Sequence, residues 1–189
     1  MNDKPLMGRT IALMVANGFD EIEFTEPQKR LIEAGAKVTV VSRANGLVNG
    51  WYDGGWGHFF PVDADLADTL AVDYDGLIVP GGIRSVEKMA EDPHAKRILK
   101  AFLRADMPTA LIGDGAKLTI ASDDAKDRPV TGSPEIREAM VEAGADWRDE
   151  DVVLSGNLVS GTGAEVIDRV MEQFAELVAG YVNEVNEAA

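Results

Sequence analysis

The sequence predicts an α/β fold in which a mostly parallel central sheet is covered by helices on both faces. Short apolar runs rich in β-branched residues alternate with stretches of helical spacing, and this alternation is typical of parallel sheets. The segments on either side of Ser155-Gly156-Asn157 instead indicate a small antiparallel hairpin at the margin of the sheet. With 189 residues and neither a linker nor an internal repeat, the chain is expected to form a single domain over residues 1–189.

The predicted strands are short apolar runs that stop at glycine, proline or polar residues. In chain order they are Thr10–Ala16, Lys37–Ser42, Gly76–Val79, Thr109–Ile112 and the two hairpin strands Val152–Leu154 and Leu158–Ser160. The runs TIALMVA and GLIV are apolar almost throughout, as expected for strands that are buried on both faces.

The predicted helices lie between or after these strands. They cover Phe24–Ala34, His94–Ala105, Ala116–Ser122 and Glu165–Val182. Gly35 fits the end of the first helix, and Asp92-Pro93 fits the start of the second. The stretch Asn45–Gly57 is rich in Gly, Asn and Trp and is long for a connection, so we expect a surface hairpin or loop there.

Two features of the composition limit the possible functions. The chain has no cysteine, which excludes disulfides, zinc–cysteine sites, iron–sulfur clusters and a cysteine nucleophile. It has 18 basic and 33 acidic residues and a formal net charge of −15, which argues against nucleic-acid binding. No apolar run is long enough for a membrane span and Met1–Thr10 lacks the apolar core of a signal peptide, so we expect a cytoplasmic protein.

Ligands of parallel α/β sheets bind at the carboxyl ends of the strands, and four segments are expected to meet there. They are Asn17–Glu23, Pro80–Gly82, Gly113–Gly115 and Thr131–Ser133. Gly113–Gly115 lies between a buried strand and a helix, which is the position of a nucleophile elbow. We expect Asp114 to cap the helix that follows. The alternatives are a carboxylate that acts as base or nucleophile, and ligand binding through backbone N–H groups.

An acidic cluster of Asp20, Glu21 and Glu23 lies just before or inside the first predicted helix. Carboxylates in a first helical turn interact favourably with the helix dipole, which accounts for at least one of them. The spacing of Asp20 and Glu23 suggests that they share a face. If that face meets the elbow, the crowded charge raises one pKa and creates an acid–base pair, whereas the alternative is a solvated rim.

Neither a metal nor an organic cofactor is predicted. His58 and His94 lack a second ligand at metal-binding spacing, and no P-loop or dinucleotide-binding fingerprint follows a strand. The aromatic residues Trp51, Tyr52 and Trp56 are dense enough to mark an interface. Self-association through them and simple packing of the loop are both open.

These segments resemble the PfpI-type intracellular proteases, whose class I glutamine-amidotransferase-like superfamily also includes the Parkinson-associated protein. The similar pieces extend from about Gly8 to Leu177 and are ANGFDEIEFTEP, WGHFFPVDADLAD, DYDGLIVPGG, PTALIGDGAKLTIAS, AGADWRDEDVV and GNLVSGTG. The resemblance implies a flavodoxin-like three-layer sandwich that is often assembled into homodimers or higher homo-oligomers. It also implies cysteine peptidase, deglycase or glyoxalase-like activities.

The resemblance further implies a site that this chain retains only in part. Active relatives carry a cysteine at the elbow, where this chain has Gly113, and commonly a histidine next to it, where this chain has Asp114. Asp20 and Glu23 remain as candidates for the acidic residue that bonds the thiol. The turn that supplies the oxyanion hole remains as Gly81-Gly82. Ser160-Gly161-Thr162 lacks the arginine of the family's Thr-Ser-Arg.

Two functions follow from these residues. The first is a non-catalytic binding or stress-response protein, because covalent catalysis needs a nucleophile and Gly113 has no side chain. The alternative is a hydrolase or lyase of a small molecule that uses Asp114 with Asp20 or Glu23 as its acid–base pair. In either case we expect a homo-oligomer, a possible small-molecule ligand and negative charge around the vacated site. That charge is expected to come from Asp20, Glu21, Glu23 and Asp114.

Overall fold

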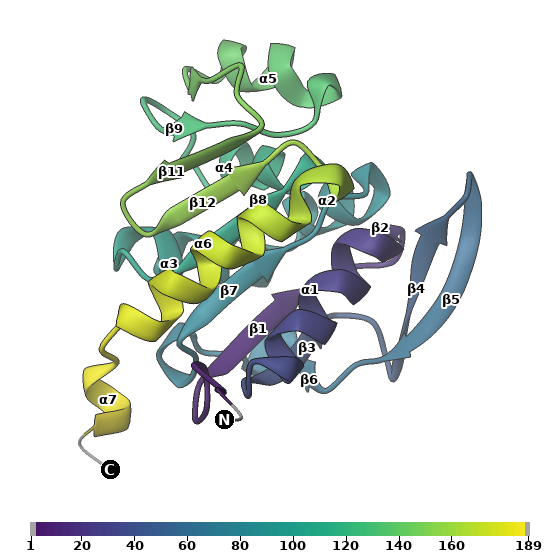
Figure 1. Cartoon of the computed structure of the whole chain (residues 1–189). Helices are drawn as coiled ribbons and strands as arrows, with labels where there is room; N and C mark the ends of the chain where they lie inside the picture. The colour runs from purple at the N-terminus through teal and green to yellow at the C-terminus, as the bar shows by residue number, and fades with distance from the viewer. Residues whose placement is uncertain (1–2, 188–189) are drawn as a thin grey trace.

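The computed structural model describes residues 3–187 and confirms the predicted α/β fold (Figure 1). The main sheet consists of β1 (Thr10–Met14), β3 (Lys37–Ser42), β6 (Ala64–Asp65), β7 (Gly76–Val79), β8 (Thr109–Ile112), β11 (Val152–Ser155) and β12 (Leu158–Gly161). These strands lie in the order β11-β12-β8-β7-β1-β3-β6. All neighbouring pairs are parallel except β11 and β12, which form the predicted hairpin at one edge.

Helices cover both faces of this sheet (Figure 1). One layer contains α1 (Glu21–Glu33) and α6 (Ile167–Gly180), and the other contains α2 (Ile83–Glu91), α3 (Pro93–Arg104) and α4 (Leu118–Ala121). The shorter helices α5 (Arg137–Glu142) and α7 (Glu184–Glu187) lie outside these layers. Helix α2, which begins directly after the Gly81-Gly82 turn, was not predicted from the sequence.

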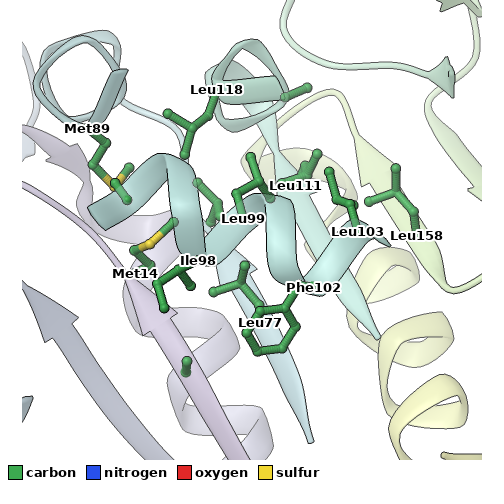
Figure 2. Packing of buried hydrophobic residues seen from close by; sticks show 14 of the residues in the cluster. Met14, Leu77, Met89, Ile98, Leu99, Phe102, Leu103, Leu111, Leu118 and Leu158 are labelled. Carbon is green, nitrogen blue, oxygen red and sulfur yellow. The ribbon is translucent and has the colours of Figure 1, made fainter. Parts of the chain in front are cut away.

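Each face of the sheet has its own hydrophobic core. On the α3 side, Phe102 packs among residues that include Leu77 of β7 (Figure 2). On the α6 side, Phe174 belongs to a second cluster that contains Ile78 of the same strand. Consecutive strand residues point to opposite faces, so an uninterrupted apolar strand such as β7 supplies both cores.

The Gly- and Trp-rich segment forms a hairpin of β4 (Leu47–Tyr52) and β5 (Gly55–Pro61), which extends beyond the predicted range. Its turn is Asp53-Gly54, a dipeptide favoured in two-residue hairpin loops. The hairpin lies to one side of the main sheet (Figure 1) and pairs with β2 (Phe19–Asp20), which leads into α1. This pairing holds the start of α1 between the hairpin and the main sheet.

Short elements complete the fold. β9 (Pro129–Val130) and β10 (Asp146–Trp147) pair in parallel. The 3₁₀ helices are η1 (Leu66–Asp68), η2 (Ala71–Asp73), η3 (Gly113–Lys117), η4 (Pro134–Ile136) and η5 (Ala164–Val166). Because η3 follows β8 and η5 follows β12, both begin at the carboxyl end of the sheet. Within residues 3–187, no helix combines the length and the apolar character needed to span a membrane.

Candidate functional site

A cavity of about 620 Å³ opens at the carboxyl end of the sheet. Asp20 and Glu23 line it from the start of α1, Gly113 and Asp114 from η3, and Ser133 from the turn before η4. Three of the four segments expected at this end therefore contribute to the lining. The remaining segment, the turn before α2, supplies hydrogen-bond donors to two of these side chains.

Gly113 retains the backbone of a nucleophile elbow without the side chain. It is the first residue of η3, directly after β8, and its φ of +57° lies in the left-handed region that glycine adopts without strain. A Cβ atom at this position would lie 2.7 Å from Oε1 and 3.1 Å from Oε2 of Glu23. The direction in which a side chain would project thus leads to the carboxyl group of Glu23.

Glu23 provides a buried acid group beside the elbow. Its side chain is only 7% exposed, and its Oε1 accepts a hydrogen bond from the Gly81 N–H at 2.9 Å. Burial raises the pKa of Glu23 from 4.5 to about 8, with a smaller contribution from the negative charge of Asp20 and further ones from Asp114 and Glu165. The Gly81 hydrogen bond opposes this rise. Glu23 is therefore largely protonated at neutral pH.

Asp114 does not cap its own helix, contrary to the expectation from its position. The helical turn begins at Gly113, so Asp114 lies inside it and the capping position falls on Ile112, which makes no side-chain cap. Oδ2 of Asp114 accepts from the Gly82 N–H at 3.3 Å, and Oδ1 accepts from Ser133 Oγ at 2.5 Å. Asp114 therefore connects η3 to the start of α2 and to the Ser133 turn.

The turn predicted to form an oxyanion hole donates both of its N–H groups to carboxyl groups. The Gly81 N–H is bonded to Glu23 and the Gly82 N–H to Asp114. An oxyanion hole requires donors that are preorganised and free to meet developing charge. A substrate oxyanion would have to displace both side chains to reach these two donors.

The acidic residues at the start of α1 lie in two different environments, the cavity and the hairpin. Asp20 caps α1, since its Oδ1 accepts from the N–H groups of Ile22 and Glu23 at 3.0 Å each. Glu21 points away from the cavity into the hairpin, where it accepts from the N–H of His58 and contacts His58 Nδ1 at 3.0 Å. The expectation that Glu21 surrounds the vacated site is therefore wrong, because successive helical residues project about 100° apart.

Three charged residues of the cavity were missed by the sequence analysis. Lys117 reaches it from η3, Glu135 from η4 and Glu165 from η5. Glu165 follows β12, so the strand-end rule that identified the other segments also applies to it. Nothing in the local pattern marks Lys117 or Glu135. Among residues 3–187, no group of three or more histidine, aspartate or glutamate side chains is arranged to hold a metal ion.

The aromatic residues of the hairpin are partly packed and partly exposed. Trp51 and Trp56 contact each other with ring centroids 5.3 Å apart, and the guanidinium of Arg84 in α2 lies 3.7 Å from the centroid of Trp51. This cation–π contact attaches the hairpin to α2. Tyr52 and Trp56 nevertheless remain 51% and 55% exposed. Trp51 is explained by its contacts within the chain, to Trp56 and Arg84. A role of the hairpin in self-association stays a prediction.

Comparisons with known proteins agree with the resemblance found in the sequence. Residues 9–177 match the model of the DJ-1/PfpI family. "Putative cysteine protease YraA" of Bacillus subtilis is 32% identical over 154 residues, which cover 82% of this chain and 89% of the relative. A ThiJ/PfpI domain protein from Brachyspira murdochii superimposes with a TM-score of 0.83 at 22% identity, over 93% of this chain and 99% of its own. DJ-1beta of Drosophila melanogaster superimposes with a TM-score of 0.82 at 26% identity, over 97% of this chain and 96% of its own.

Proposed function

Because this chain belongs to the DJ-1/PfpI family and contains no cysteine, we propose that it is a non-catalytic member that binds a small molecule, as a binding or stress-response protein. The observation that carries the proposal is the elbow. Its left-handed backbone is retained at Gly113, yet no nucleophilic side chain projects from it. Covalent catalysis in this family's manner needs such a group.

The surroundings of Gly113 support the same proposal. Both N–H groups of the Gly81-Gly82 turn are bonded to carboxyl groups, which leaves neither free for an oxyanion. The cavity of about 620 Å³ is within the range of small-molecule sites. A binding function uses this cavity without requiring the groups that the chain lacks.

We expect the purified protein to show no turnover of peptides, glycated amines or 2-oxoaldehydes above that of a heat-denatured sample. The reason is that Gly113 has no side chain and that the chain contains no cysteine. The measurement is product formation over time with each substrate class. Turnover that is abolished in Asp114→Asn and unchanged in the surface variant Asp68→Asn would contradict the proposal.

That outcome would support a second candidate, a carboxylate-based hydrolase or lyase. The observation that favours it is Glu23, whose pKa of about 8 makes its carboxyl group a proton donor at neutral pH. Asp114 lines the same cavity and does not cap its own helix. An acid–base site can be formed by two carboxyl groups in one cavity, when one is protonated and the other ionised.

We also propose that the protein forms a homo-oligomer through its hairpin. Tyr52, Trp56 and Phe59 are 51%, 55% and 62% exposed, and β5 is an edge strand of its sheet. Between Leu47 and Val62 the only acidic residue is Asp53. Two copies of a chain with a net charge of −15 meet the least repulsion at such a surface.

The double variant Trp56→Ser/Phe59→Ser is expected to have a lower oligomeric mass than the wild type by light scattering coupled to size-exclusion chromatography. It removes apolar surface from the proposed interface, together with the contact of Trp56 with Trp51. Leu154→Ser is a matched control, because Leu154 is 51% exposed on β11, at a different sheet edge. A wild type of monomeric mass, or a double variant of unchanged mass, would refute this interface.

A further inference from the structure

We propose that a groove between α3 and α4 binds a small molecule that carries two or more phosphate-type negative charges. The groove has a volume of about 470 Å³, which is within the range of small-molecule sites. It shares no lining residue with the cavity beside Gly113, so it is a separate site and does not depend on the proposed function. Three observations carry the inference: the charge of the lining, the lack of carboxylates that neutralise it, and the position of Arg97.

The lining of the groove is basic, although the chain as a whole is acidic. Its charged residues are Lys96, Arg97 and Lys100 of α3, and none of the described residues that line it is acidic. The other lining residues are small or apolar: Pro93, Ala101, Ala121 and Ser122. In the whole chain, acidic residues outnumber basic ones by 33 to 18. A concave surface of one sign concentrates ligands of the opposite sign, so this groove attracts anions.

Lys96 and Lys100 lie one turn apart on α3 without a counter-ion. Like charges at this spacing destabilise a helix, and α3 contains no acidic residue that could offset the repulsion. Within residues 3–187, neither lysine forms an ion pair. Both side chains are partly buried, as expected where a lysine stem lies along the protein and its ammonium group stays in water. An anion in the groove would remove the repulsion between the two.

The carboxylates that flank the groove in sequence do not neutralise it. Asp92 caps α3 and lies 3.6 Å from Arg43 Nε. Asp124 lies 3.7 Å from Arg104 Nε. Asp123 is exposed and is not part of the lining. Two of these three carboxylates therefore already face an arginine outside the groove, and the charge of its lining is left for a ligand.

Arg97 is held beside the groove by two backbone carbonyl groups. Its Nη2 donates to Leu66 O at 3.4 Å and to Thr69 O at 3.1 Å. These bonds fix the guanidinium through one nitrogen and leave Nε and Nη1 for a ligand. A guanidinium matches the oxygens of a phosphate group with several donors, and lysine ammonium groups add compact positive charges. Three cations at one groove suit an anion with two or more charges better than a single carboxylate.

The net charge of −15 limits the size of this ligand. At physiological salt, electrostatic attraction between exposed charges extends over about 8 Å. A small anion inside the groove therefore interacts mainly with the three cations of its lining. An extended polyanion such as a nucleic acid would also meet the acidic surface around it. The charge distribution thus favours a small phosphorylated molecule.

The test titrates pyrophosphate into the full-length protein at pH 7 and follows backbone amide NMR spectra. Malonate, a dicarboxylate of similar size, and hexaglutamate, an acidic peptide, are the comparison probes. We expect pyrophosphate to shift the resonances of residues 94–101 and 121–122 and to bind about tenfold more tightly than malonate. An increase in salt from about 0.05 M to about 0.3 M is expected to weaken its binding severalfold, because the charges of the groove are partly exposed.

Two double variants locate the binding at the lysines. Lys96→Gln/Lys100→Gln is expected to weaken pyrophosphate binding about tenfold or more, whereas Lys96→Arg/Lys100→Arg keeps both charges and is expected to retain it. Lys29→Gln/Lys37→Gln is the matched control, because it removes the same net charge from two exposed lysines that do not line the groove. None of the four lysines is buried, so all three variants are expected to fold.

The outcomes distinguish this site from the alternatives. The inference is overturned if pyrophosphate shifts no resonance of the groove, or if the control variant weakens binding as much as Lys96→Gln/Lys100→Gln. Equal affinity for malonate overturns the phosphate class. Tighter binding of hexaglutamate on the same resonances assigns the groove to an acidic protein segment and overturns the small-molecule class. None of these results bears on the cavity beside Gly113, so the proposed function is tested separately.

Discussion

Replacing Glu23 by glutamine is expected to make the protein more stable than the wild type at pH 9, and the gain is expected to vanish near pH 4. Burial raises the pKa of Glu23 from 4.5 to about 8 in the folded state. Between these values the folded protein holds a proton that the unfolded chain has lost. At about 1.4 kcal/mol for each pH unit, this interval corresponds to roughly 3–5 kcal/mol.

The sign of the effect follows from which state binds the proton. The stability that the protonated Glu23 contributes is fully present below pH 4.5 and is lost as the pH rises through about 8. Glutamine is neutral at every pH and retains an oxygen for the Gly81 N–H. It therefore does not undergo this loss.

Urea unfolding of both proteins at pH 4, 7 and 9 measures the difference. Glu33→Gln is the control, because Glu33 lies at the exposed end of the same helix, and this variant is expected to follow the wild type at every pH. A difference between Glu23→Gln and the wild type that is the same at all three pH values would show that folding does not raise the pKa of Glu23.

Gly82→Ala is expected to destabilise the protein by roughly 3–5 kcal/mol, from backbone strain and overpacking together. Gly82 has a φ of +98°, and a Cβ on it would lie 2.4 Å from Gly18 O, 2.6 Å from Asp20 N and 2.7 Å from Phe19 Cα. All three are backbone atoms that cannot rotate away. The strand β2 must therefore move, and with it the Asp20 cap of α1 and the cavity wall.

Gly54→Ala separates the two causes of this loss. Its φ is also positive, at +77°, but no atom lies within 4 Å of a Cβ. Its expected cost is about 1–2 kcal/mol, that of the backbone conformation alone. Denaturant midpoints of the two variants give the comparison. Equal losses would mean that the collision at β2 contributes nothing.

Local sequence pattern was sufficient for most of the fold. The runs Gly76–Val79 and Thr109–Ile112 were predicted with the boundaries of β7 and β8, because continuous apolar runs of that length occur in buried parallel strands. Helix α2 was missed because its segment IRSVEKMAE is largely polar and buries Ser85 along with Val86 and Met89. Ser85 can be buried because its Oγ accepts a hydrogen bond from the Ala16 N–H at 2.9 Å. That partner lies in a distant part of the chain.

The site was predictable as a set of segments and not as a set of contacts. The strand-end rule and the family resemblance together identified Asp20, Glu23, Gly113 and Asp114, all of which line one cavity. Neither indicated that Glu21 turns into the hairpin, nor that Asp114 bonds Gly82 and Ser133 instead of capping its helix. These outcomes depend on which donors other segments bring near each side chain.

Composition and local pattern were enough to establish an α/β fold and to exclude a thiol nucleophile, because both depend only on residue types and their order along the chain. The properties of Glu23 required the packed molecule. Its burial sets its pKa, and the groups around it, the Gly81 N–H and the carboxyl groups of Asp114 and Glu165, belong to segments far from α1 in sequence. The same packing places the carboxyl group of Glu23 where a side chain on Gly113 would project, a contact that the sequence order of the two residues does not reveal.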